Sequence, residues 1–295
     1  MKGKCSLDKW EFNYIKDLKD WDVLAWTDEE AYEMYPDYNR VYDKLFIARR
    51  CSTLKTYDLE KVLPSKYPVI VKPKINLVGM SKGAYIASSI DEIGLTKGMM
   101  AQEIAKGNHY SMDLVFQDGE IIDWFAFQAH KNYYGSFTLF ASTSICNEYV
   151  CTQIKSIMKG YTGVVCVEYI GHQIIDVHLR PSVQFFDICG GLQEQLPHFI
   201  KTGEWNVTKF EKTYSKVYRR FEDSHVVKFR NLRKPNAIRS VQECWERDKY
   251  LSENDNDMFS YRYMVINGTN LESIENYAFV IHEHLRFYTK KDDRK

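Results

Sequence analysis

Short runs rich in apolar and β-branched residues fill the middle of the chain, from Pro64 to about Phe199. Runs of this length and type are typical of β-strands, in which successive side chains point to opposite faces. Tight-turn residues join two pairs of runs, at Gln117–Gly119 and Gly171–Gln173, so antiparallel hairpins are expected there. The runs are residues 67–71 (YPVIV), 99–105 (MMAQEIA), 111–116 (SMDLVF), 120–130 (EIIDWFAFQAH), 136–143 (SFTLFAST), 164–170 (VVCVEYI) and 173–179 (QIIDVHL).

Apolar residues at helical spacing predict helices elsewhere. Leu7–Leu18 and Asn39–Arg50 show this spacing, and Asn147–Lys159 predicts a clear helix that Gly160 ends. A short helix is expected at Ser89–Leu95, because two acidic residues fall in its first turn. Strands mixed with helices, with hairpins more evident than βαβ alternation, predict an α+β layered architecture.

The composition limits the kind of protein. The chain has 295 residues, and its 40 basic and 40 acidic residues cancel, so no overall positive field indicates nucleic acid as a partner. Seven cysteines without a CxxC pair disfavour a disulfide framework and a structural zinc site. No run approaches the ~18 apolar residues of a membrane-spanning helix. We therefore expect a cytoplasmic protein without a membrane partner, and the oligomeric state stays open.

Two lysines stand at the end of the first apolar run. Pro68–Val71 has the length of a buried strand, which would place Lys72 and Lys74 at its end. The loop that follows contains small and polar residues, including Ser81 and Gly83, which let backbone N–H groups approach an anion closely. The pattern predicts an anion-binding strand end, and a surface hairpin with solvated lysines is the alternative.

Acidic residues face each other in the last predicted hairpin. A three-residue loop at Gly171–Gln173 would pair Cys166 with His178 and Glu168 with Asp176. Because side chains repeat every second residue, Glu168, Asp176 and His178 would share one face, within ~5 Å of their neighbours. Two opposed carboxylates repel each other unless a positive charge lies between them.

A divalent cation is one way to supply that charge. Mg²⁺ is commonly held by one or two carboxylates together with phosphate oxygens, so Glu168, Asp176 and His178 are the candidate metal ligands. Arg180 lies in phase with them and is suited to neutralise a phosphate or carboxylate in the same cleft. The alternative is a solvent-facing strand pair with ordinary polar alternation.

The order of these motifs resembles that of the ATP-grasp superfamily over roughly Asn39–Phe199. In that pattern an early Asp-Lys precedes the domain, a Lys-Pro strand and a small-residue loop meet the phosphates, and a hinge strand lines the adenine and ribose. An acid, a Glu-x-Asn pair and often an Arg-Pro then follow on adjacent strands. The matching segments here are Asp43-Lys44, Lys72-Pro73, Asn76–Gly83, Gln102–Gly107, His109–Asp113, Glu168, Asp176–His178 and Arg180–Ser182.

The sequence departs from the family pattern at three places. Gln102 stands where the hinge is commonly acidic, and His109 stands where a ribose-binding acid is common. Asp176-Val177-His178 replaces Glu-x-Asn, and an imidazole nitrogen suits Mn²⁺ better than Mg²⁺. The region before the Lys-Pro strand is also short for a substrate-binding domain.

The resemblance implies an ATP-grasp fold, in which two α+β subdomains hold ATP between them. Residues 1–65 would form a short, mostly helical N-terminal region, and residues 66–107 a first subdomain with the Lys-Pro strand, phosphate loop and hinge. Residues 108–200 would form the second subdomain with the metal-binding hairpin. Residues 201–295 would be a less regular C-terminal extension, with Leu251–Met258 as the best loop candidate.

The function implied is an ATP- and Mg²⁺-dependent ligase that activates a carboxylate as an acyl phosphate for attack by an amine or similar nucleophile. The substrates would be small carboxylates and amines, or peptides. Lys72 and Arg180 would be the catalytic residues, and Glu168, Asp176 and His178 the metal ligands. The residues implied for ATP binding are Lys44, Lys72, Lys74, Ser81, Gly83, Gln102, Glu103, Ile104 and His109.

Other functions stay open at this point. The substitutions at His109 and His178 allow a nucleotide-binding or regulatory protein that has lost ligase chemistry. An ATP-dependent kinase of a small hydroxylated molecule and a plain α+β binding protein are further alternatives. Cysteine-protease chemistry at Cys166 is disfavoured, because the residue lies in an apolar strand without an activating group near it in sequence.

Overall fold

The computed structural model describes residues 23–77, 83–131, 137–182, 184–185, 191–209, 212–220, 224–226, 233–243, 261–284 and 287–289. The predicted helix Leu7–Leu18, the phosphate-loop residue Ser81 and the predicted loop Leu251–Met258 lie outside these residues. None of the helices in the described part is long and apolar enough to cross a membrane.

The first sheet is small and antiparallel, with strand order β1-β4-β2-β3. Its strands are β1 (Thr56–Asp58), β2 (Val69–Pro73), β3 (Tyr85–Ala87) and β4 (Met99–Glu103). The predicted runs YPVIV and MMAQEIA correspond to β2 and β4. In β2, Val69 and Val71 are fully buried, as expected for a strand against a core.

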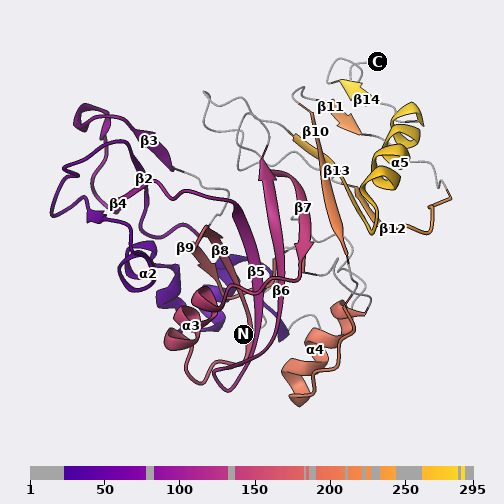
Figure 1. The fold of residues 1–295 in the computed structure, drawn as a ribbon, viewed down its shortest axis with the longest axis horizontal. Coiled ribbons are helices and arrows are strands. Elements are labelled where there is room, and N and C mark those ends of the chain that lie inside the picture. Colours follow the sequence, from indigo (N-terminus) through magenta and orange to yellow (C-terminus); the bar gives the residue numbers. More distant parts are fainter. Residues whose placement is uncertain are drawn as a thin grey trace.

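The second sheet has eight strands in the order β12-β13-β10-β7-β6-β5-β8-β9. The five predicted runs after residue 108 correspond to the strands from β5 to β9, and C-terminal strands extend the same sheet at the β7 side (Figure 1). A separate pair is formed by β11 (Ser224–Val226) and β14 (Phe287–Thr289). The strands of the large sheet are β5 (His109–Gln117), β6 (Glu120–Lys131), β7 (Phe137–Thr143), β8 (Gly163–Ile170), β9 (Gln173–His178), β10 (Tyr214–Arg220), β12 (Ile238–Glu243) and β13 (Tyr261–Gly268).

Helices cover both faces of the large sheet. Along β5, Met112 and Leu114 pack with Ile154 of α3, whereas Val115 faces the opposite way and shares a cluster with Phe199 of α4. This alternation is the period of two expected for a strand buried on both faces. The helices are α1 (Asp28–Met34), α2 (Lys44–Cys51), α3 (Glu148–Ile157), α4 (Leu192–Thr202) and α5 (Leu271–His284), with 3₁₀ turns η3 (Asn39–Tyr42) and η4 (Ile90–Glu92).

Two helix predictions need correction. Asn39–Arg50 is η3 followed by α2, because Asp43 is extended (φ −77°, ψ 100°) and its side chain caps the second helix. Ser89–Leu95 contains only the single 3₁₀ turn η4. The helix predicted at Asn147–Lys159 is confirmed as α3, with Asn147 as its N-cap.

The acidic hairpin has the predicted pairing but a different loop. Glu168 pairs with Asp176, and Cys166 pairs with His178, as expected. The loop has two residues rather than three, because Ile170 pairs with Gln173. A β-bulge on β9 takes up the extra residue, Ile175.

Candidate functional site

Lys44 lies where the two sheets meet. It is the first residue of α2, which Asp43 caps by accepting two backbone N–H groups of the first turn. The backbone N–H of Lys44 donates to the carbonyl of Lys74, directly after β2, at 2.7 Å. Its Nζ donates to Oδ2 of Asp176 on β9. The start of α2 therefore ties the small sheet to the edge of the large one.

Lys72 is the second lysine of this cluster and is only 8% exposed. Its Nζ donates to the carbonyl of Ile175 at 3.2 Å, and Ile175 is the bulge residue without a cross-strand partner. Burial and the neighbouring charge of Lys44 lower the pKa of Lys72 to about 8. The carboxylates of Asp176 and Glu168 oppose this shift. Perturbed lysines of this kind are concentrated at functional sites.

Glu168 and Asp176 are both held by groups of the protein itself. Oε2 of Glu168 lies 3.2 Å from Nε2 of His109, and Asp176 pairs with Lys44. Burial raises the pKa of Glu168, but the hydrogen bond with His109 and nearby cationic groups outweigh it and lower the pKa to about 2. His109 packs edge-on against Phe137, and its Nδ1 is buried without a hydrogen-bond partner in the described part of the chain.

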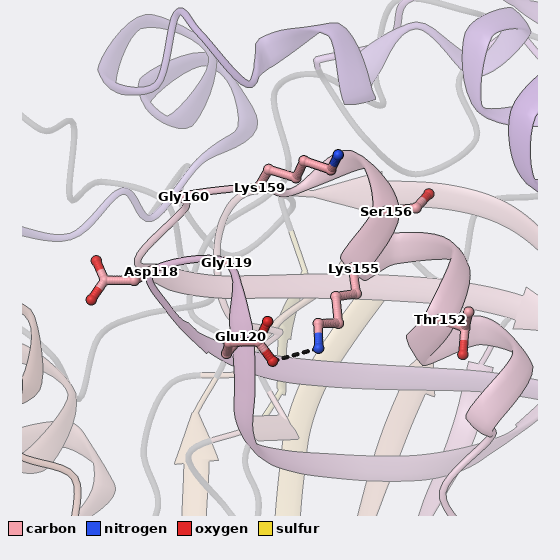
Figure 2. A pocket seen from close by; sticks show the side chains of 8 residues that line it. All are labelled: Asp118, Gly119, Glu120, Thr152, Lys155, Ser156, Lys159 and Gly160. Carbon is pink, nitrogen blue, oxygen red and sulfur yellow. Dashed lines mark hydrogen bonds and ion pairs between the residues drawn. The ribbon is translucent and has the colours of Figure 1, made fainter.

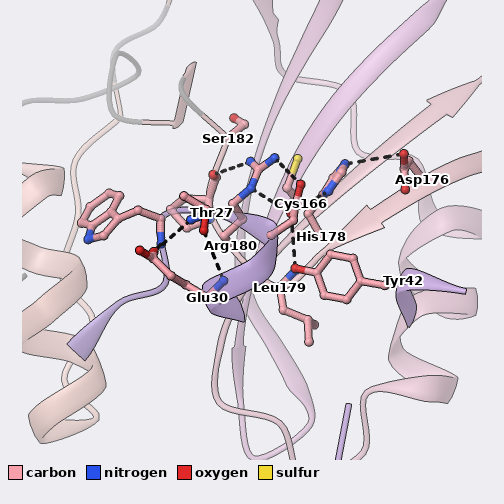
Figure 3. Close-up of polar contacts among 12 residues, drawn as sticks. Thr27, Glu30, Tyr42, Cys166, Asp176, His178, Leu179, Arg180 and Ser182 are labelled. Carbon is pink, nitrogen blue, oxygen red and sulfur yellow. Dashed lines mark hydrogen bonds and ion pairs between the residues drawn. The ribbon is translucent and has the colours of Figure 1, made fainter. Parts of the chain in front are cut away.

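Asp28 contacts three side chains around the end of β9, those of Tyr42, His178 and Arg180, which Figure 3 labels. It is 3% exposed, and its two oxygens lie 2.9 and 3.0 Å from Nε and Nη2 of Arg180. Oδ1 also lies 3.0 Å from Nδ1 of His178 and accepts a hydrogen bond from the Tyr42 hydroxyl at 3.3 Å. Burial raises the pKa of Asp28, but Arg180 and His178 hold it well below its usual range. Asp28 is therefore an ionised carboxylate inside the protein.

His178 is placed between two carboxylates. Its Nδ1 contacts Asp28, and its Nε2 lies 3.9 Å from Oδ2 of Asp176. Burial lowers the pKa of His178, but the charges of Asp28 and Asp176 outweigh it and raise the pKa. The contact with Asp28 occupies Nδ1, so Nε2 is the ring nitrogen that faces Asp176.

The predicted metal ligands are brought together only in part. Within the part of the chain that the structure describes, no group of three or more His, Cys, Asp and Glu is arranged to hold a metal ion. Glu168 and Asp176 do face each other across the hairpin. This donor pair fits Mg²⁺, which commonly takes one or two protein carboxylates and completes its shell with phosphate oxygens and water. The metal site stays a prediction to which these two carboxylates are suited.

The other predicted ATP-binding residues are spread along β2 and β4. Lys74 pairs with Asp58 at 2.5 Å and lies near Glu60, so it does not join Lys72. Gln102 is buried and donates to Ser52, Glu103 accepts from the Lys55 backbone N–H, Ile104 is exposed, and Gly83 (φ +78°) lies beside Pro73.

Sequence reasoning missed two buried acids of this region. Asp28 lies in the segment Thr27–Glu30, whose capping box was readable as a helix start but carried no hint of a partner on β9. Asp113 on β5 accepts the backbone N–H and the hydroxyl of Ser182 at 2.6 and 2.5 Å, which fixes the chain after Arg180. Burial raises the pKa of Asp113 to about 6, against the hydrogen bonds of Ser182.

Two surface grooves lie away from this cluster. One, of about 470 Å³, lies between α3 and the β5–β6 turn and contains the ion pair of Lys155 and Glu120 (Figure 2). The other, of about 320 Å³, lies along α2 beside Phe46. Neither is lined by Lys44, Lys72 or the hairpin acids, so the cluster of charged side chains, and not the groove, defines the candidate site.

Solved structures share this architecture. An L-amino acid ligase from Bacillus licheniformis aligns with 89% of this chain and 77% of its own, with a TM-score of 0.60 and 11% identity. The neighbours with this arrangement are ATP-grasp proteins. The chain has the ATP-grasp fold. A phosphoribosylamine–glycine ligase from Thermotoga maritima aligns with 85% of this chain and 78% of its own, with a TM-score of 0.57 and 13% identity.

A third ATP-grasp structure was determined with ATP bound. Carboxyaminoimidazole ribonucleotide synthase from Aspergillus clavatus, complexed with ATP, aligns with 85% of this chain and 75% of its own, with a TM-score of 0.57 and 12% identity. No protein-family model matches the sequence, and no curated protein matches it. The likeness is thus one of fold, carried by a divergent sequence.

Proposed function

We propose that this protein is an ATP- and Mg²⁺-dependent ligase, which activates a carboxylate as an acyl phosphate and joins it to an amine or similar nucleophile. The observation that carries the proposal is the convergence of Lys44 and Lys72 on the acidic hairpin of Glu168 and Asp176, at the junction of the two sheets. The neighbours of the same fold include two enzymes named as ligases, which supports this reaction type.

The proposed reaction has two steps. A carboxylate oxygen of the acid attacks the γ-phosphorus of ATP, the bond between that phosphorus and the β–γ bridging oxygen breaks, and ADP leaves. The amine then attacks the acyl carbon, its proton passes to solvent, and inorganic phosphate leaves with the electrons of the C–O bond. Because the reacting groups of the first step are anionic, fixed positive charge lowers its barrier.

The lysines supply that charge. Lys44 comes from the start of α2 and Lys72 from β2, and both reach β9, so a phosphate chain between the sheets would meet both ammonium groups. In the structure Lys44 pairs with Asp176, and Lys72 donates to the Ile175 carbonyl. We propose that both lysines turn to the phosphates when ATP binds, which brings the pKa of Lys72 back towards its ordinary value.

The acidic hairpin would hold the metal. Glu168 and Asp176 are the proposed ligands, and the ion, when bound, neutralises charge on the phosphate oxygens. His178 and Arg180 lie on the same side of β9, with Arg180 proposed to face the phosphoryl group in transfer. The contact of His178 with Asp28 favours this residue as a neighbouring cation rather than a ligand.

A thermal-shift experiment tests the proposal. ATP at a hundredfold excess over its dissociation constant, with Mg²⁺ or Mn²⁺, should stabilise the protein by ~2.7 kcal/mol and raise the melting midpoint by a few degrees. Lys72→Met and Asp176→Asn should lose the shift. Lys155→Met, in the exposed pair with Glu120, is the matched control and should keep it. Absence of a shift in the wild type with either metal would exclude the ligase.

A nucleotide-binding protein without turnover is the second candidate. It is favoured by the pairing of His178 with Asp28, which takes one predicted ligand away from the metal. This candidate shares the thermal shift but predicts no ADP release with any mixture of carboxylates and amines. Carboxylate-dependent release of ADP and phosphate, abolished in Asp176→Asn, would exclude it.

A further inference from the structure

We propose that Asp28 is a positioning residue, which holds the guanidinium of Arg180 so that its free N–H groups face the γ-phosphoryl group of ATP. This inference rests on the proposed function. It adds a residue from the N-terminal region to a site otherwise built by β2, α2 and the hairpin of β8 and β9.

The contact between the two side chains is bidentate. Nε and Nη2 of Arg180 lie 2.9 and 3.0 Å from the two oxygens of Asp28, and Nη1 donates to the Pro181 carbonyl at 3.3 Å. A guanidinium carries five N–H groups in a fixed plane. Within the described residues three of them contact the protein, and we propose that the other two bind the anion.

The direction of the contact follows from burial. Asp28 is 3% exposed, whereas the side chain of Arg180 is 19% exposed. The carboxylate is therefore the more deeply buried partner, and part of the arginine side chain reaches the surface. An arginine held by a buried carboxylate keeps its orientation and loses little conformational freedom when it binds a planar or tetrahedral anion.

Asp28 is itself held on several sides. The Tyr42 hydroxyl donates to it at 3.3 Å and accepts the backbone N–H of Leu179 at 3.0 Å, so η3 and the end of β9 are linked through one hydroxyl. Asp28 is also the first residue of α1, whose start is fixed by the capping box of Thr27 and Glu30. This rigidity is what a positioning residue requires.

A comparison of two nucleotides separates positioning from structural support. Only ATP carries the γ-phosphate, so Arg180 should contribute to the affinity for Mg·ATP and not to that for Mg·ADP. In Asp28→Asn, which keeps the size but removes the charge, we expect Mg·ATP to bind about tenfold or more weakly by calorimetry. Mg·ADP should bind within twofold of the wild type. A merely structural role would change both affinities alike.

Two further variants complete the test. Arg180→Lys should show the same selective loss, and the double variant with Asp28→Asn should lose nothing more. Asp28→Glu, which keeps the charge, should recover part of the ATP preference and serves if Asp28→Asn fails to fold. An unchanged ratio of the two affinities in both Asp28 variants would overturn the inference and leave the ligase proposal standing. A wild type that binds neither nucleotide would overturn the proposed function itself.

Discussion

At the scale of single residues, Lys72 is the site residue whose buried charge opposes folding. Its ammonium group is buried beside another lysine, and its hydrogen-bond acceptor among the described residues is the neutral carbonyl of Ile175. The nearby carboxylates of Asp176 and Glu168 offset only part of the effect of burial, and an incompletely compensated buried charge opposes folding. Such a position is retained where function requires it, and anionic phosphates are the ligand that would compensate it.

Removing this charge should therefore stabilise the protein at neutral pH. The lowered pKa of Lys72 corresponds to roughly 3 kcal/mol of unfavourable free energy for holding the charge in the folded protein. The substitution also removes the hydrogen bond to the Ile175 carbonyl, which contributes about 1 kcal/mol to stability. Lys72→Met should thus gain roughly 2 kcal/mol in the free energy of unfolding at pH 7, measured by urea denaturation. Lys74→Met is the control and should destabilise, because Lys74 pairs with Asp58.

The gain should depend on pH with a defined sign. The folded-state pKa of Lys72 is about 8 and the usual value is 10.5, so between these limits the unfolded state binds more protons. The stability of the wild type therefore rises with pH across this window, and the advantage of Lys72→Met should shrink towards pH 10. An advantage that stays constant from pH 7 to pH 10 would contradict the buried charge as its cause.

The sequence reached part of the site at this scale. The pairing of Glu168 with Asp176 followed from the period of two along a hairpin, which is a local property. Asp28 could not be found in this way, because its partners Arg180 and His178 lie some 150 residues further along the chain. Only the tertiary fold brings the start of α1 to the end of β9.

At the scale of elements, the turn between β5 and β6 shows how closely the elements pack. Asp118 and Gly119 both have positive φ, at 51° and 84°, as a two-residue hairpin turn requires. A Cβ on Gly119 would lie 2.5 Å from the backbone nitrogen of Gly160, at the end of α3. The turn is therefore fixed both by its own conformation and by the helix packed against it.

Gly119→Ala should consequently destabilise the protein by about 2 kcal/mol or more, since backbone strain and a backbone clash add. The measurement is the free energy of unfolding by urea denaturation. Gly94→Ala is the matched control, because a Cβ there meets no atom within 4 Å, and it should change stability little. Equal effects of the two substitutions would show that the turn tolerates a side chain.

The presence of a strand was easier to predict from the sequence than an irregularity within it, such as a β-bulge. The strands β2 and β4 to β9 were visible as apolar runs, whereas the short strands β1 and β3 were not. The bulge at Ile175 could not be predicted from the sequence. A two-residue loop with this bulge and a three-residue loop without it both pair Glu168 with Asp176. The strands β10, β12 and β13 carry charged and aromatic residues without a clear alternation, so their place in the large sheet was not foreseen.

At the scale of the whole molecule, charged side chains join parts that are distant in sequence. Lys44 links α2 to β9, Lys72 links the small sheet to β9, and Asp28 links α1 to the chain after β9. Apolar clusters also pack the N-terminal helices against the sheets, with Ile47 of α2 in the core of the large sheet and Leu45 against Met100 of β4. The polar contacts add fixed charges to the same junctions. The stability of the assembled molecule should therefore respond to pH.

The acid side of that response depends on Asp28. Its folded-state pKa lies below the unfolded value of 3.8, so its contribution is present above that value and is lost as pH falls below it. Asp28→Asn leaves the partly buried guanidinium of Arg180 without its carboxylate partner and should cost about 3 kcal/mol at pH 7. At pH 3 the difference in melting temperature between Asp28→Asn and the wild type should be smaller than at pH 7. Melting temperatures of both proteins, measured from pH 7 to pH 3, test this. Glu33→Gln, an exposed residue of α1, is the control and should match the wild type throughout. A deficit of Asp28→Asn that is the same at pH 7 and pH 3 would mean that the carboxylate charge does not join these elements.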